Sequence, residues 1–378
     1  MKPEQLVSRR ARRVTQRDIA QIVGVSSATV SYACNGHDGV SDELRERILS
    51  VGRELGFRPN RAARGLRLGR MNMIGLLLAD VGNPFYAELA SGVVGDASEA
   101  GVQVFLAQAG LGGAMQADAA RTLVDHGCDG LIFSSVVDSD LDILLELQRE
   151  GVPFVFANRR VDGVDVDWVH IDDYAAAAEA CELLLSTGCR RVAVLGGPSQ
   201  SSASRARNAG AVETLSRSGL RVTHKDFVDG QLTRESGRKR AEWILGGHDA
   251  PNGIVCGNDM IALGVMDVCH ERGIRIPADV AVIGFDDMSF ASAGPLQLTT
   301  VSVPRVAMGS RAGAMLRERI AGYDGPGRHE CLPYNLQIRA TTRRAQQDEQ
   351  EGRRVTHRTA AMSAARTRAT GALGQDAP

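Results

Sequence analysis

From residue 73 onwards, short apolar runs alternate with segments of helix length. The runs occupy residues 73–78, 103–107, 130–134, 154–157, 191–195, 253–256 and 280–285. Because each run is apolar throughout rather than at alternate positions, we expect strands of a parallel sheet with helices over both faces. Alternating β and α units predict a doubly wound α/β architecture. There are too many strands for one small sheet, so we expect two similar lobes.

Three segments have the pattern expected of connections between such lobes: residues 169–173, 299–303 and 332–337. They divide a two-lobed core over 71–342 into an N-lobe (about 71–170 and 302–333) and a C-lobe (about 171–299 and 335–342). Residues 343–378 are rich in Arg, Ala, Gln and Thr without hydrophobic periodicity. This composition predicts a disordered tail, with a terminal amphipathic helix as the alternative.

Ahead of the core, residues 15–35 have the pattern of two short helices joined by a tight turn. Thr15 can cap the first helix in a capping box with Asp18, Gly24 fits the left-handed position that ends it, and Ser26 can cap the second. The spacing predicts packing between the helices through Ile19, Ala20, Val23, Val25 and Val30. It leaves an outward face of Ser27, Ala28, Thr29, Ser31 and Tyr32. This helix-turn-helix geometry places a helix in the major groove of DNA.

A third helix is expected after Ser41, with an apolar stripe of Leu44, Ile48, Val51 and Leu55 that Gly56 ends. These helices form an all-α head over residues 14–58, preceded by a basic flexible arm at 1–13. Residues 59–70 are a hinge or linker, in which 60–68 can form a short helix. That helix is too short to be stable alone, so we expect it to form against DNA and a partner subunit.

The charge distribution supports a nucleic-acid partner for the head. Residues 1–70 contain 14 Lys and Arg against 7 Asp and Glu, whereas residues 71–342 contain 23 against 34. A basic head before an acidic body is the electrostatic footprint expected for phosphate contacts. A soluble Arg-rich arm would give the same charge balance. The helix-turn-helix pattern is therefore needed to distinguish a DNA-binding head from such an arm.

Other classes of protein find little support. The seven cysteines are scattered without metal-ligand spacing, so we expect no metal, and no cofactor is implied. No apolar segment near the start resembles a signal peptide, which favours a cytoplasmic protein over a transport-type sugar-binding protein. The motifs GxSxG, HExxH and the P-loop are missing, and Gly196-Gly197-Pro198 is only a loop, so we expect no enzyme.

The chain resembles the LacI/GalR family of bacterial transcriptional repressors across roughly residues 14–342. The resemblance rests on VTQRDIAQIVGVSSATVSYACN, VSDELRERILSVGRELGFRPNRAARGL, IGLLLADVGNPFYAELASGV, NDMIALGVM, DVAVIGFDD and LTTVSVP, in this order. It implies a homodimer that reads a pseudo-palindromic operator in double-stranded DNA, and a core like the periplasmic sugar-binding proteins. A small ligand between the lobes, a sugar or sugar derivative, would modulate operator affinity. A nucleobase or nucleoside is the alternative.

The resemblance also assigns DNA contacts. Ser27, Ala28 and Tyr32 match base-reading positions, although Arg is common where Tyr32 stands. The expected phosphate-positioning groups are Thr15, Arg17, Ser26, Ser31 and Asn35, with Thr29 beside them on the outward face. Leu66 matches the hinge leucine that wedges into the minor groove, with Asn60 and Ala63 on the same side. Tyr32 as a half-buried helix residue and Leu66 as a packing leucine are the alternatives.

Ligand contacts are expected at the carboxyl ends of the core strands. The candidates are Phe85, Tyr86, Asn158, Arg159, Arg207, Asn258 and Asp286, of which the last two and Arg207 match ligand positions of the family. A carboxylate, an amide and a guanidinium together can bracket a polyol. The alternatives are that Asp286 caps a helix and that Asp287 pairs with a local cation. Leu232 stands where relatives often carry a stacking aromatic ring.

Overall fold

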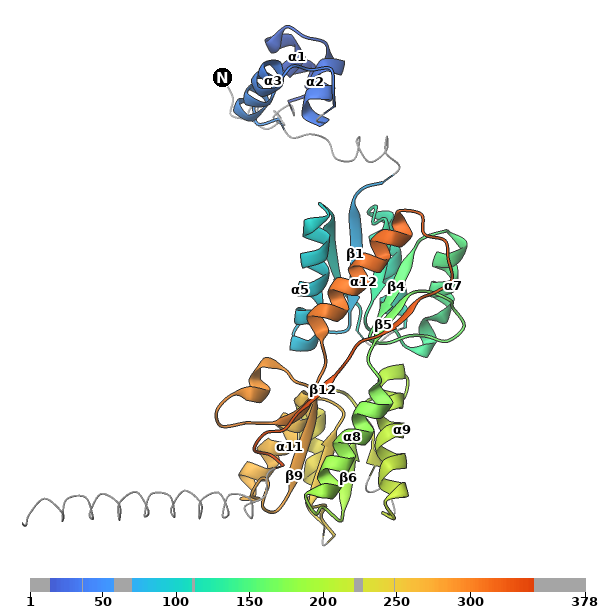
Figure 1. The fold of residues 1–378 in the computed structure, drawn as a ribbon, viewed down its shortest axis with the longest axis vertical. Helices are drawn as coiled ribbons and strands as arrows, with labels where there is room; N and C mark the ends of the chain where they lie inside the picture. The colour runs from blue at the N-terminus through green and yellow to red at the C-terminus, as the bar shows by residue number, and fades with distance from the viewer. Residues whose placement is uncertain are drawn as a thin grey trace, which may run out of the picture. The chain divides into compact units, whose positions relative to one another are not determined.

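The computed structural model describes residues 14–35, 37–57, 70–110, 113–220, 227–247 and 249–342. The arm at 1–13, the hinge residues Asn60, Ala63 and Leu66, and the tail at 343–378 lie outside the described residues. The chain divides into two compact units, Met1–Met71 and Asn72–Pro378 (Figure 1). None of the described helices is long and apolar enough to cross a membrane.

The first unit contains α1 (Gln16–Val23), α2 (Ser27–Asn35) and α3 (Asp42–Glu54). The predicted caps are confirmed. Thr15 and Asp18 form a capping box at the start of α1, Gly24 ends the helix with φ 79°, and Ser41 accepts the Leu44 N–H at the start of α3. The three helices enclose a small core of Ile19, Ala20, Val23, Val30, Ala33, Val40 and Ile48.

The second unit contains two six-stranded sheets, which confirms the predicted two-lobed α/β fold. The first sheet has the order β11-β5-β4-β3-β1-β2 and is parallel throughout. Its strands are β1 (Met73–Leu78), β2 (Gln103–Gln108), β3 (Gly130–Phe133), β4 (Phe154–Ala157), β5 (Trp168–His170) and β11 (His329–Cys331).

The second sheet has the order β12-β10-β9-β8-β6-β7 and is parallel except for the antiparallel pair of β10 and β12. Its strands are β6 (Val192–Leu195), β7 (Phe227–Val228), β8 (Gly253–Cys256), β9 (Ala281–Asp286), β10 (Thr299–Ser302) and β12 (Asn335–Gln337). The chain passes between the sheets after β5, after β10 and between β11 and β12, at the three segments where the sequence predicts connections.

Helices cover the sheets in pairs. Around the first sheet lie α5 (Pro84–Glu99), α6 (Ala114–Asp125), α7 (Leu141–Arg149) and α12 (Arg305–Ile320), and around the second α8 (Asp173–Ser186), α9 (Ser202–Arg217), α10 (Arg234–Ile244) and α11 (Asp259–Glu271). Short 3-10 turns lie at Asp138–Asp140 and Ser289–Ser292. Side chains of β1 divide between two layers: Ile74, Leu76 and Leu78 pack with residues of α5 and α12, and Leu77 packs with residues of α6 and α7.

The expectation that every strand is covered on both faces is wrong for β2. This strand lies at the edge of its sheet, and Phe105 and Leu106 are 47% and 51% exposed. The apolar run at 103–107 shows that the segment forms a strand, but an apolar run does not distinguish a central strand from an edge strand. The exposed apolar edge is therefore a feature that only the fold reveals.

Helices α5 and α12 lie side by side (Figure 1) because glycines allow their backbones to touch. A Cβ atom added at Gly92 of α5 would overlap the carbonyl oxygen of Val306, and one at Gly309 of α12 would overlap that of Leu89. Asp96 and Arg317 form a bidentate ion pair farther along the same contact, with N–O distances of 2.6 and 2.9 Å. The two helices are thus fixed against each other by close packing and by charge.

Replacing Gly92 by Ala should destabilise the core by about 1–3 kcal/mol, because the new methyl group forces α12 away from α5. Gly95→Ala in the same helix is the matched control, since no atom lies within 4 Å of an added Cβ there. It should stabilise the protein by about 0.5–1 kcal/mol through helix propensity. Urea unfolding of the two variants measures both effects, and equal shifts would contradict the packing argument.

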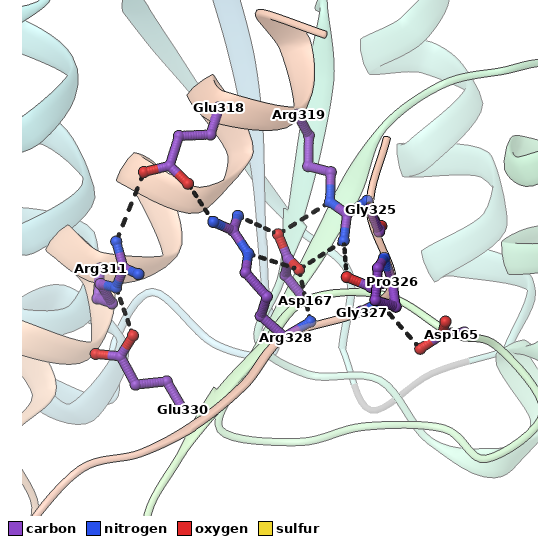
Figure 2. Close-up of polar contacts among 10 residues, drawn as sticks. All are labelled: Asp165, Asp167, Arg311, Glu318, Arg319, Gly325, Pro326, Gly327, Arg328 and Glu330. Atoms are coloured by element: carbon purple, nitrogen blue, oxygen red, sulfur yellow. Dashed lines mark hydrogen bonds and ion pairs between the residues drawn. The ribbon is translucent and has the colours of Figure 1, made fainter. Parts of the chain in front are cut away.

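A buried carboxylate, Asp167, ties the end of α12 and the segment between α12 and β11 to the start of β5. Arg319 donates to its two oxygens at 2.7 and 3.0 Å, and Arg328 donates two side-chain bonds, at 2.7 and 3.2 Å, and its backbone N–H at 2.8 Å. Figure 2 shows this cluster and its extension through Glu318, Arg311 and Glu330. Burial by itself would raise the pKa of Asp167, but the bonds from Arg319 and Arg328 outweigh it and hold the pKa well below its usual value.

Asp167→Asn should lower the free energy of unfolding at pH 7 by about 3 kcal/mol, because it leaves two guanidinium groups without their shared countercharge. The depressed pKa means that the ionised carboxylate stabilises the fold above the unfolded-state pKa of about 4, and that this contribution is lost as the pH falls below that value. The difference between wild type and variant should therefore shrink below pH 4. Asp118→Asn, which removes an exposed ion pair to Arg121, should change stability by less than about 1 kcal/mol.

Candidate functional site

Polar side chains gather where strands of both sheets end. Asn158 and Arg159 follow β4, Asn258 follows β8, and Asp286 is the last residue of β9. Asn158 has φ 73° and Asp286 has φ 101°, in the left-handed region that non-glycine residues rarely adopt. Strained backbone of this kind is retained where the surrounding fold imposes it, often at binding sites.

Arg207, on the buried face of α9, organises the C-lobe part of this site. Its Nε donates to Asp173 at 2.7 Å and its Nη1 to the carbonyl of Gly257 at 2.9 Å, and Nη1 lies 3.5 Å from an Asp286 oxygen. The guanidinium also lies over the ring of Phe285, 3.7 Å from its centroid. Burial alone would lower the pKa of Arg207, but Asp173 and Asp286 outweigh it and raise the pKa. The group is thus a permanent, fixed cation.

The N-lobe part comes from β4 and the first turn of α5. Arg159 is 2% exposed and donates one long hydrogen bond, 3.4 Å, to the hydroxyl of Tyr86. Phe85 packs edge-on against Tyr86, with ring centroids 5.2 Å apart, and belongs to the hydrophobic core. Asn83 caps α5 by accepting the Phe85 N–H at 3.0 Å. Tyr86 and Arg159 therefore present polar atoms from this lobe.

The two parts act on each other electrostatically. Burial raises the pKa of Asp286 to about 6, and the charges of Arg207, Arg305 and Arg159 oppose the rise. Tyr86 of the N-lobe feels both Asp286 and Arg207 of the C-lobe, although burial is the main reason that its pKa is raised. The structure thus brings Tyr86, Arg159, Arg207 and Asp286 into one site.

Within the described residues, five buried side-chain atoms have no hydrogen-bond partner, and all belong to residues of this region. They are Asn158 Oδ1, Arg159 Nε, Arg159 Nη1, Asp286 Oδ1 and Arg305 Nη1. Buried polar atoms in native proteins are satisfied in the great majority of cases, and an unsatisfied one costs about 1–3 kcal/mol. Unpaired donors and acceptors from both lobes at one place are the signature of a site that binds a polar molecule.

Asn258 has a structural role. Its Oδ1 caps α11 by accepting the Ile261 N–H at 2.9 Å, and its Nδ2 donates to the Leu232 carbonyl at 3.2 Å. Asp287 forms an ion pair with Arg339 at 2.7 Å, as the alternative interpretation of that residue expects. Asp286, in contrast, does not cap a helix: its Oδ1 accepts no hydrogen bond and lies 3.5 Å from Arg207 Nη1.

Arg305 and Asp173 were not among the predicted site residues. Arg305 donates to Glu88 at 2.8 and 3.1 Å and to the Asp287 carbonyl at 2.9 Å, and it is 6% exposed. It follows β10 by three residues, so the rule that ligands meet strand ends could have found it. Asp173 is the first residue of α8. It can be identified as a residue of the site only once its contact with Arg207 is known.

In the head, the residues expected to contact DNA are largely exposed. Thr15, Arg17, Ser26, Ser27 and Ala28 are exposed, Tyr32 is 52% exposed with its ring edge-on to His37, and Thr29 is half-buried with its hydroxyl 2.8 Å from that of Ser26. The expectation that Ser31 faces outward is wrong, because it is buried. At 100° per residue, position 31 borders the arc that carries the buried Val30. Asn35 ends α2, and its side chain lies outside the described part.

Metal binding finds no support in the part of the chain that the structure describes, where no group of three or more His, Cys, Asp or Glu is placed to hold an ion. Burial raises the pKa of the Cys128 and Cys269 thiols to about 11. A thiol with a pKa this high is a weak nucleophile at neutral pH.

Comparison with known proteins matches both units. Residues 15–60 match the family model of bacterial regulatory proteins of the lacI family, and residues 71–356 match that of periplasmic binding proteins and the sugar-binding domain of the LacI family. The transcriptional regulator DegA of Bacillus subtilis is 30% identical, over 87% of this chain and 98% of DegA.

Solved structures agree. The complex of the transcriptional regulator CelR with cellobiose is similar with a TM-score of 0.66 and 30% identity, over 87% of this chain and 100% of that one. The Lac repressor dimer bound to operator and the anti-inducer ONPF is similar with a TM-score of 0.79 and 27% identity, over 87% and 99%. The chain therefore belongs to the LacI family of bacterial transcriptional regulators.

Proposed function

We propose that this regulator is a homodimeric repressor in the cytoplasm, and that a small sugar or sugar derivative bound between its lobes changes its affinity for a pseudo-palindromic operator. The observation that carries the proposal is the set of five unpartnered buried atoms on both lobes. A ligand that reaches both lobes binds one lobe arrangement better than another, which is the requirement for coupling to a distant DNA site.

The proposed effector contacts are Tyr86, Asn158, Arg159, Arg207 and Asp286, with Asn258 and Phe85 supporting them through the α11 cap and the core. A sugar is favoured because a free amide oxygen, a carboxylate and guanidinium groups match the donors and acceptors of neighbouring hydroxyls. The similar CelR structure supports this chemistry, since it is a complex with cellobiose.

The proposed DNA contacts are made by the exposed residues of the head. Arg17, Ser26 and Thr15 lie at helix starts, where hydroxyl, guanidinium and backbone N–H groups meet phosphates. Tyr32, with half its surface exposed, is proposed to read a base edge together with Ser27 and Ala28. Because Tyr forms single rather than bidentate hydrogen bonds, it discriminates guanine less than Arg does.

The proposed dimer contact includes the exposed edge strand β2 and the adjoining helix α5. Phe105 and Leu106 of β2 and Val94 of α5 are all more than 40% exposed, and the two elements pack against each other. An exposed apolar strand edge invites a second chain. A second copy is the occupant we infer, because the similar Lac repressor structure is a dimer.

The coupling is tested with the full-length protein and an operator isolated by binding selection. A sugar that raises the melting temperature in a screen of mono- and disaccharides should change the operator Kd, and the operator should change the sugar Kd by the same factor. Titration of sugar with and without operator measures both factors. Equal sugar affinity in the two titrations would contradict the proposal.

Asp286→Asn should weaken binding of that sugar roughly 10- to 100-fold, because it removes a charged acceptor, and should leave operator binding without sugar unchanged. Asp287→Asn is the neighbouring control, and its sugar affinity should stay within about threefold of wild type. Since the pKa of Asp286 is raised to about 6, protonation below that pH should weaken sugar binding by wild type but not by Asp286→Asn. Calorimetric titrations at pH 5 and pH 7.5 check this difference.

Leu106→Lys should shift the protein from dimer to monomer and weaken operator binding, because a buried lysine charge at an apolar contact is costly. Trp243→Lys is the control, since Trp243 of α10 is similarly exposed, at 53%, but lies on the other lobe. Sedimentation equilibrium distinguishes the two variants. A dimeric Leu106→Lys protein would exclude β2 from the interface.

A further inference from the structure

We infer that the effector carries a negatively charged group, a carboxylate or a phosphate, which Arg159 binds with the help of Arg305. The inference rests on the proposed function, because it concerns the same site between the lobes. It starts from the unusual state of Arg159, a guanidinium that is 2% exposed and forms no ion pair with any residue in the described part of the chain.

The hydrogen bonds of Arg159 are also incomplete. A guanidinium has five N–H donors, but Nε and Nη1 of Arg159 have no partner, and Nη2 donates only the 3.4 Å bond to Tyr86. Removing an uncompensated charge from water costs several kcal/mol. A neutral hydroxyl could accept one of these hydrogen bonds, whereas the oxygens of an anion could accept several and would add a negative charge within ion-pair distance of Arg159.

The carboxylates of the region are already bound to other cations. Asp173 pairs with Arg207 at 2.7 Å, Glu88 pairs with Arg305 at 2.8 Å, and the nearest guanidinium to Asp286 is that of Arg207 at 3.5 Å. Asp259, the remaining buried acid near Asp286, is committed to the Thr300 hydroxyl and the Met288 N–H, and burial raises its pKa well above the usual value. Each of the first three carboxylates thus lies within ion-pair distance of Arg207 or Arg305, and none within that distance of Arg159, whose charge acts on Asp286 only from farther away.

Arg305 contributes a second unsatisfied cationic donor to the same place. Its Nη1 is buried without a partner, whereas its other nitrogens hold Glu88 and the Asp287 carbonyl. Tyr86, which accepts from Arg159, and Glu88, which accepts from Arg305, are two residues apart at the start of α5, where the helix dipole adds a positive potential. Planar guanidinium groups match carboxylate and phosphate oxygens in geometry as well as in charge.

The first test measures the full-length protein without ligand. Arg159→Gln should melt at the same temperature as wild type or higher, because the variant no longer buries an unpaired charge. Arg207→Gln, which breaks a buried ion pair, should melt several degrees lower. A clear drop in the melting temperature of Arg159→Gln would overturn the inference, because it would show that the protein itself satisfies Arg159.

The second test compares inorganic phosphate, glucuronate and glucose 6-phosphate with glucose and with chloride at equal ionic strength. Phosphate should stabilise wild type more than chloride does, and at least one charged sugar should bind roughly 10- to 100-fold more tightly than glucose. Arg159→Gln and Arg305→Gln should lose this preference, and Arg121→Gln, an exposed control, should keep it. Anion binding that persists equally in Arg159→Gln would place it elsewhere, such as on the basic head, and would overturn the inference.

The outcomes separate this inference from the proposed function. If neutral sugars bind, change operator affinity and are preferred over charged ones, the effector is uncharged and the inference fails while the proposed function stands. If charged sugars bind through Arg159 but operator affinity does not change, the anionic site stands and the coupling fails.

Discussion

The contact on which the C-lobe site depends is the buried ion pair of Arg207 with Asp173. It joins α9 to the first residue of α8, and the same guanidinium holds the carbonyl of Gly257 after β8 and lies over Phe285 of β9. One side chain thus fixes four segments that are far apart in sequence. Breaking such a buried pair by removing one partner is costly, commonly several kcal/mol, so the position of Asp286 is determined as much by Arg207 as by its own strand.

The opposite lobe is arranged differently. Its cation, Arg159, has no such carboxylate, and the lobe is held instead by the contact of α5 with α12 and by the cluster around Asp167 (Figure 2). The C-lobe part of the site therefore has two carboxylates, Asp173 and Asp286, around one arginine, whereas the N-lobe part has two arginines, Arg159 and Arg305, and one carboxylate, Glu88.

Much of this could be predicted from sequence because it depends on local patterns. The capping box of Thr15 and Asp18, the turn at Gly24 and the central strands follow from residue types at short spacing. Ser31 was misjudged because a helical position at the border of two faces is decided by what packs against it. The expectation that the strand containing Leu106 is covered on both faces was wrong because β2 lies at the edge of its sheet. The order of strands in a sheet is not encoded in the sequence of a single strand.

In the candidate site too, some residues could be predicted from local sequence patterns and others could not. Strand-end reasoning indicated Asn158, Arg159 and Asp286, each next to an apolar run. It could not show that both polar atoms of Asn258 are bound within the lobe or that Arg305 keeps a free donor. Those facts depend on contacts between residues distant in the chain, such as Glu88 with Arg305. Hydrogen-bond satisfaction is a property of the assembled fold.

The crossing of the chain between its sheets has a consequence for biosynthesis. The first sheet is completed by β11, and its helix layer by α12, both of which are made after the whole of β6–β10. The second sheet is completed by β12, later still. The first sheet therefore lacks its last strand until β11 is made, and the second sheet lacks its last strand until β12 is made. Until α12 is made, the face of α5 that α12 covers in the folded core stays exposed on the nascent chain, and exposed apolar surface of this kind is prone to aggregation.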